Sequence, residues 1–143
     1  MKTRILLLAL LLALLLALPA QAAEEGARKK VDLPDMMKQH MLSNMRDHLV
    51  TLHEIHTLLG RGELDKAGEV AEARLGMSSL VSHNAAHMAP YMPKEMQAAG
   101  TEMHHAASRF AITAKEGDLP RALESLSKVT AQCVACHGAF RLN

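Results

Sequence analysis

Two cysteines and a histidine close to the C-terminus constrain the fold of this 143-residue chain more than any other feature. Cys133, Cys136 and His137 form the pattern Cys-x-x-Cys-His. The spacing of three residues puts both sulfurs on one face of a helix. This pattern is the attachment signature of c-type haem, in which the thiols become thioethers and the histidine binds the iron on its proximal side. It therefore predicts one covalent haem c per chain, held at the end of a helix.

The same pattern has two other interpretations, a redox-active pair of thiols and half of a zinc site. A zinc site needs further ligands of matching type, and the chain contains only these two cysteines. Because both cysteines belong to one motif, no other disulfide can form within the chain. The haem interpretation is therefore favoured.

The first 22 residues have the pattern of a secretory signal peptide. Lys2 and Arg4 supply the positive charge, residues 5–18 are almost all Leu and Ala, and Ala20-Gln21-Ala22 is a small-x-small site that suits signal peptidase, with cleavage after Ala22. The apolar run is shorter than the roughly 20 residues of a transmembrane helix, so we expect no membrane span after cleavage. Since c-type haem is attached outside the cytoplasm, signal and motif together predict a periplasmic protein.

Residues 23–143 are expected to form one domain. Two of the 16 Lys and Arg residues lie in the signal peptide, which leaves 14 against 15 Asp and Glu. This balance gives no sign of the basic patch that nucleic acid requires, so no nucleic-acid partner is expected. We also find no Ser–His–Asp set, carboxylate pair or phosphate loop, and we do not expect an enzyme. With two Phe, one Tyr and no Trp, the core could use a bulky prosthetic group as filler.

Apolar residues recur at helical steps of three and four, and no stretch alternates as a strand would. The predicted helices cover about 34–59, 63–88, 94–115 and 119 into the haem motif, with glycines or prolines between them. Residues 23–31 are predicted to be loose. Four helices with short connections favour antiparallel neighbours, so we predict an all-α fold, an antiparallel up-down-up-down four-helix bundle. The start of the first helix, the second connection and the haem motif then lie at one end.

About the last 27 residues resemble the class II c-type cytochromes, which include cytochrome c′ and the low-spin c-556 type. The residues that carry the resemblance are the turn Gly117-Asp118-Leu119, the helix after it, the motif, and the aromatic–basic pair Phe140-Arg141. Class I cytochromes c carry the motif near the start of the chain instead. The resemblance implies electron transfer with redox partner proteins in the periplasm. Class II proteins often dimerise through their first two helices, so it leaves a homodimer open.

The resemblance also assigns roles to residues. It implies thioether bonds for Cys133 and Cys136 and the proximal iron ligand for His137. It suggests that Arg141 lies close to the haem and its propionates, and the alternative for Arg141 is a solvated charge at the C-terminus.

In this family the residue on the distal side of the iron comes from the start of the first helix. The distal residue should lie about four helical turns before the end of that helix. This position favours Met45, and Met41, one turn earlier, is the reserve. A methionine ligand would suit electron transfer, whereas a non-ligating apolar residue would leave the iron open to NO or CO. Each Met also has a plain interpretation as core filling. The other candidates near this position are Met36, Met37, His40 and His48.

A second group of potential ligands closes the predicted second helix. His83 and His87 are four residues apart, so a continuous helix would place them on one face. A two-histidine face is a common metal-binding element, and a methionine such as Met88 would favour Cu(I). A periplasmic protein that binds copper or another metal is therefore an alternative function. The plainer interpretation is that these residues line the haem pocket.

Overall fold

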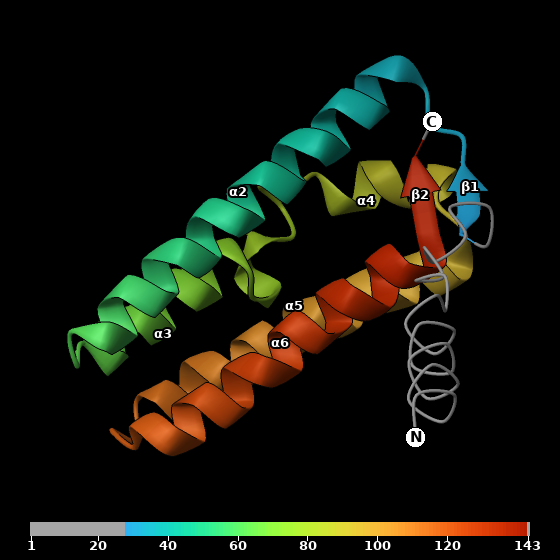
Figure 1. Cartoon of the computed structure of the whole chain (residues 1–143). Helices are drawn as coiled ribbons and strands as arrows, with labels where there is room; N and C mark the ends of the chain where they lie inside the picture. The colour runs from blue at the N-terminus through green and yellow to red at the C-terminus, as the bar shows by residue number, and fades with distance from the viewer. Residues whose placement is uncertain (1–27, 143) are drawn as a thin grey trace, which may run out of the picture.

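The computed structural model describes residues 28–142, and these are mostly helical, as predicted (Figure 1). The predicted signal peptide lies outside the described residues. Among the described residues, no helix has the length and apolar character that a membrane crossing requires. In chain order the elements are β1 (Lys29–Val31), α2 (Asp35–Gly60), α3 (Leu64–Arg74), the 3-10 turn η1 (Met77–Ser79), α4 (Ala85–Met88), the 3-10 turn η2 (Ala89–Tyr91), α5 (Lys94–Ala114), α6 (Leu119–Ala139) and β2 (Phe140–Leu142).

The first, third and fourth predicted helices are confirmed as α2, α5 and α6, each starting within a residue of its predicted position. Gly62 and Gly117 make the turns after α2 and α5, and both have a φ of +76°, which glycine adopts without a steric penalty. The Asp118 side chain caps α6, since its Oδ1 accepts a hydrogen bond from the backbone N–H of Arg121 at 3.1 Å.

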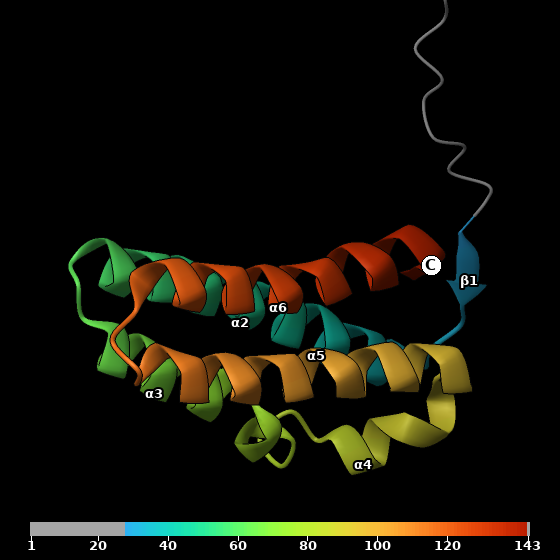
Figure 2. The same ribbon diagram turned by 90° about the horizontal axis from the view of Figure 1, so that it is seen from below.

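The predicted second helix, 63–88, is wrong beyond Arg74. The backbone N–H groups of Leu75 and Gly76 both donate to the carbonyl of Ala71, at 2.8 Å each, and this closes α3. Gly76 then turns to an extended conformation, so the chain leaves the helix axis. The helical spacing of apolar residues did not reveal this break, which depends on backbone geometry at one glycine. The remainder, from η1 to α4, continues past α3 along the same side of the molecule (Figure 2).

Two short strands also correct the prediction that the chain has no strand, and β1 corrects the prediction of a loose segment at residues 29–31; residues 23–27 lie outside the described residues. β1 pairs in parallel with β2, with Lys29 opposite Phe140 and Val31 opposite Leu142. Val31 is buried against the rest of the fold. Three-residue strands are too short to show a period of two, and the pairing joins segments more than 100 residues apart. The pair holds the start of the described chain beside the residues that follow the Cys-x-x-Cys-His motif (Figure 1).

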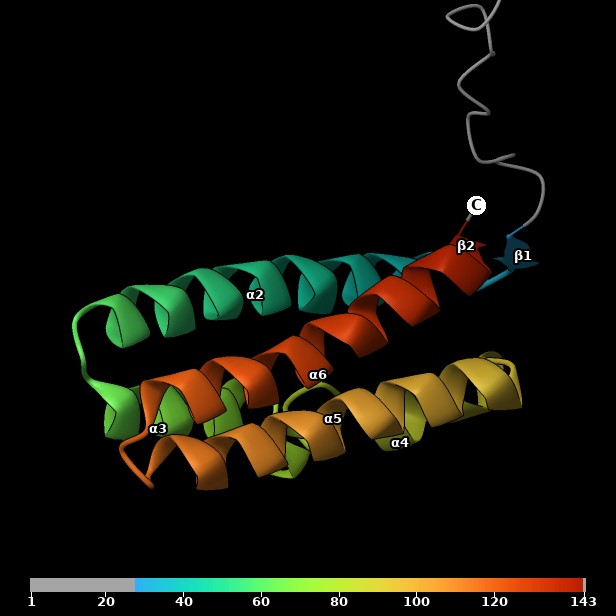
Figure 3. The ribbon, with the colours of Figure 1, turned by 60° about the horizontal axis from the view of Figure 1, so that its bottom comes forward.

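The helices pack in sequence, α2 against α3, α3 against α5, and α5 against α6 (Figure 3). One hydrophobic core joins them, with Phe110, Ile55 and Leu75 among its largest fully buried side chains. The start of α2, α4 and the end of α6 lie at one end of the molecule (Figure 1).

Candidate haem-binding end and a buried histidine cluster

The packed core stops short of the end that carries the Cys-x-x-Cys-His motif. On α6, buried residues extend as far as Val129, whereas Cys133 and Cys136 are half-buried and His137 is exposed. On α5, the buried residues begin only at Met103, about two and a half turns after the helix starts. The two helices therefore lose their buried face at the same end of the molecule.

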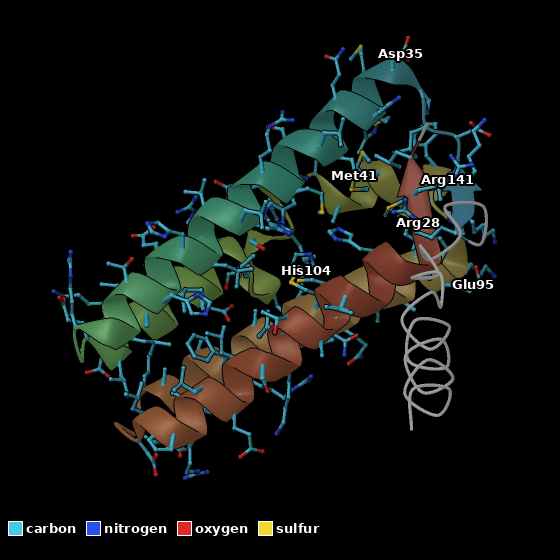
Figure 4. All side chains as sticks on the ribbon, in the orientation of Figure 1. Arg28, Asp35, Met41, Glu95, His104 and Arg141 are labelled. Carbon is cyan, nitrogen blue, oxygen red and sulfur yellow. The ribbon has the colours of Figure 1, made fainter. Side chains whose placement is uncertain are left out.

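Helix α2 shows the same change. From His48 onward its inner face is buried, but Met37, Met41 and Met45, which precede it, are only partly buried. Met41 lies at the end of the molecule where β2 carries Arg141 (Figure 4). Among the described residues, α2 and α6 are not a closely packed pair, unlike α5 and α6. The half-buried sulfurs of α2 and the motif of α6 thus border one incompletely packed end.

The two cysteines have the character of unreactive thiols. Both are free, and Cys133 packs against the hydrophobic core while its Sγ lies 3.6 Å from the carbonyl oxygen of Val129. Burial raises the pKa of Cys133 and, together with Cys133 itself, the pKa of Cys136.

Arg141 follows the motif on β2 and is partly buried. Its Nε atom is shielded from solvent and has no hydrogen-bond partner in the described part of the chain. A guanidinium carries its charge at every physiological pH and matches carboxylate geometry. A solvated terminal charge would not have a shielded nitrogen, so the side chain fits better beside an anionic group such as a haem propionate.

The proposed pair of His83 and His87 is not formed. Asn84, between them, adopts a left-handed conformation with φ of 54°, and α4 begins only at Ala85. His87 is exposed and its ring lies against Tyr91, with 6.3 Å between ring centroids. The prediction that His83 and His87 share one helical face is therefore wrong, because a single residue with positive φ reorients the chain.

His83 instead joins His48 of α2 and His104 of α5 in a buried cluster. The ring centroids are 4.9 Å apart for His48 and His83, 5.4 Å for His83 and His104, and 6.2 Å for His48 and His104. Only 8%, 9% and 8% of His48, His83 and His104 are exposed. In Figure 4 His104 lies on the side of α5 that faces α2. Met88, the third predicted ligand, is also buried.

Burial keeps the cluster uncharged. Desolvation, followed by the neighbouring His83 and His104, lowers the pKa of His48 from 6.5 to about 4. Burial is also the largest cause of the lowered pKa of His83 and of His104. All three imidazoles are therefore neutral at pH 7.

The sequence offered only a weak signal for this cluster. His48 falls on the predicted inner face of the first helix, and His104 lies next to Met103 on that of the third. Their meeting depends on how α2 and α5 pack around the segment that contains His83. The position of each histidine on its own helix gave no information about which other histidines it would contact.

Comparisons with protein-family models, with curated proteins and with solved structures find no match for this chain.

Proposed function

We propose that this chain is a periplasmic c-type cytochrome of the class II type that carries one covalent haem and transfers electrons. Cys133 and Cys136 would form the thioethers, and His137 would be the proximal iron ligand. The finer architecture belongs to the same proposal: an antiparallel four-helix bundle in which α3 and the α4 segment together stand for the second helix.

The observation that carries this proposal is the position at which the core ends. On α6 the buried side chains end at Val129, before the motif. On α2 they begin only at His48, after the methionines. Protein interiors are normally packed to the density of organic crystals, so an end lined by half-buried sulfurs and an exposed His137 needs a large apolar filler. A haem bound through the two cysteines would supply it, and Arg141 would face its carboxylates.

The bound haem would supply a one-electron redox change at iron, which the protein tunes through axial ligands and exclusion of water. Met45 remains the first choice for the distal ligand and Met41 the reserve, from their distance to the end of the helix, and both are half-buried on α2. A thioether ligand favours the reduced iron and so raises the potential. Electron transfer to periplasmic redox proteins needs no acid–base group, which agrees with the expectation that the chain is not an enzyme.

The first test is to produce the full-length chain in bacteria that possess the c-type haem attachment machinery. We expect a mature protein whose haem stays attached after denaturing electrophoresis. Cys133→Ala and Cys136→Ala should each leave one thioether, and the double variant should carry none. A wild-type protein that lacks covalent haem under these conditions would overturn the proposal.

The optical spectrum then identifies the distal ligand. A low-spin spectrum with a sulfur-to-iron band, unchanged by CO, would support a methionine ligand and electron transfer. Loss of that band in Met45→Ala but not in Met41→Ala would select Met45, and the reverse would select Met41. A high-spin spectrum that shifts on addition of CO would instead support a gas-binding protein with an open distal position.

A further inference from the structure

We propose that His48, His83 and His104 form a metal site, separate from the haem, that takes a divalent first-row transition-metal ion such as Zn²⁺. The three side chains come from α2, the segment between η1 and α4, and α5, and they converge in the interior of the protein. The proposal uses none of Cys133, Cys136, His137 and Met45, and it rests on the proposed function in that the haem takes a distal ligand other than His48.

The hydrogen bonds around Ser79 fix the proton on His83. The Ser79 hydroxyl lies 2.7 Å from the carbonyl oxygen of Gly76, which can only accept, so the hydroxyl proton is donated there. The Ser79 Oγ atom can then only accept from Nδ1 of His83, which lies 3.3 Å away. Nδ1 of His83 therefore carries the proton, and its Nε2 atom keeps a free lone pair.

The same reasoning applies to His104. Its Nδ1 atom lies 2.7 Å from the carbonyl oxygen of Leu75, and it also lies 3.4 Å from the oxygen of Ser79. Because the carbonyl can only accept, Nδ1 of His104 is the protonated nitrogen. The Nε2 lone pair of His104 is left free. Imidazoles that bind metals commonly donate their other N–H to a backbone carbonyl or polar group in this way.

His48 supplies the third nitrogen. Its Nε2 atom is shielded from solvent and has no hydrogen-bond partner among the described residues. Buried polar atoms are nearly always satisfied, so an unsatisfied one requires an explanation. A metal ion would satisfy Nε2 of His48 and use the free lone pairs of the two neighbouring rings.

Two of the three ring separations match such a site, and the separation of His48 and His104 is longer. With Zn–N bonds of 2.0–2.1 Å and tetrahedral angles, the centroids of two liganding imidazoles lie about 5 Å apart. The three separations here are 4.9, 5.4 and 6.2 Å. With the rings as they stand, no group of three or more His, Cys, Asp or Glu among the described residues could hold a metal ion. Binding must therefore turn the rings, and His48 can turn most freely because no hydrogen bond of its ring is broken.

The chemistry of the cluster favours a borderline cation. Neutral imidazole suits Zn²⁺, Cu²⁺ and Ni²⁺, and three histidines leave a fourth position for water.

The test is calorimetric titration of Zn²⁺ into the haem-loaded protein after treatment with a chelator, followed by X-ray absorption at the zinc edge. We expect one tight site per chain and a shell with three imidazole nitrogens at about 2.0 Å. His48→Phe and His104→Phe should each weaken binding more than about 100-fold, beyond the effect of losing an outer-shell group. Ser79→Ala keeps all three rings and should weaken binding by about 10- to 100-fold.

His87→Phe is the matched control, since His87 is exposed and was paired with His83 by sequence alone. Its affinity for Zn²⁺ should equal that of the wild type. The proposal fails if Zn²⁺ does not bind, if binding is lost in His87→Phe but kept in His48→Phe, or if the absorption spectrum shows fewer than three imidazoles. The absorption spectrum needs only the wild-type protein, so this test decides the proposal even if a variant does not fold.

Discussion

Acid should destabilise the metal-free protein through His48, because this side chain is buried in its neutral form. Its folded-state pKa is about 4, against an ordinary value of 6.5. Below pH 6.5 the unfolded chain binds a proton at this residue, while the folded chain stays neutral until about pH 4. The unfolded state therefore binds more protons in this window, and the free energy of unfolding falls as the pH falls.

The size of the effect follows from the difference of 2.5 between 6.5 and 4. Each pKa unit corresponds to about 1.36 kcal/mol, so His48 should lower the stability by about 3 kcal/mol between pH 7 and pH 4. Its surroundings agree with this sign. His83, His104 and His137 all oppose a positive charge on His48, and only the carboxylate of Asp47 favours it. His83 and His104, whose pKa values are also lowered, should add to the loss in the same direction.

The assay is urea unfolding with a chelator present, followed by circular dichroism at pH 7.5, 6.5, 5.5 and 4.5. His48→Gln removes one titrating group, so its stability should fall less steeply with acid than that of the wild type. The difference in slope should approach about 1.4 kcal/mol per pH unit at its steepest. His53→Gln, at an exposed position of the same helix, is the control and should follow the wild type. Parallel curves for His48→Gln and the wild type would refute the reasoning.

Three further predictions concern stability, each measured by urea unfolding at pH 7.5. Gly68→Ala should destabilise the protein by about 1–3 kcal/mol, because the new Cβ would lie 2.8 Å from the carbonyl oxygen of Ala111 on α5. Gly100→Ala, with nothing within 4 Å, should instead stabilise it by about 0.5–1 kcal/mol, and equal effects at the two glycines would contradict the packing of α3 on α5. Phe110→Ala should cost about 3–5 kcal/mol, since Phe110 is fully buried, and a loss below 1 kcal/mol would exclude a central role. Asp118→Ala should cost about 1 kcal/mol through the lost cap of α6, whereas Asp118→Asn should cost much less.

The sequence was sufficient for helices that have clear ends. α2, α5 and α6 each carry a long apolar stripe and are bounded by proline, glycine or a capping aspartate, so local preferences agree with the tertiary fold. The second predicted helix shows the opposite case. Its apolar spacing continued past Gly76, but the backbone there is extended, and Asn84 turns the chain again before α4. Periodicity reports which face is apolar and does not report where the backbone leaves the helix.

By itself, the sequence determined the chemistry that depends on neighbours along the chain. The two thiols and the imidazole of the motif are placed by helical spacing alone, and the motif needs no distant partner to be recognised. The tertiary structure decided where the core ends, how β1 pairs with β2, and that His83 meets His48 and His104 rather than His87. These contacts join residues 35 and 21 positions apart in the chain, counted from His48 to His83 and from His83 to His104. They arise because α2, α3 and α5 pack on one another, and such packing depends on all the buried side chains together.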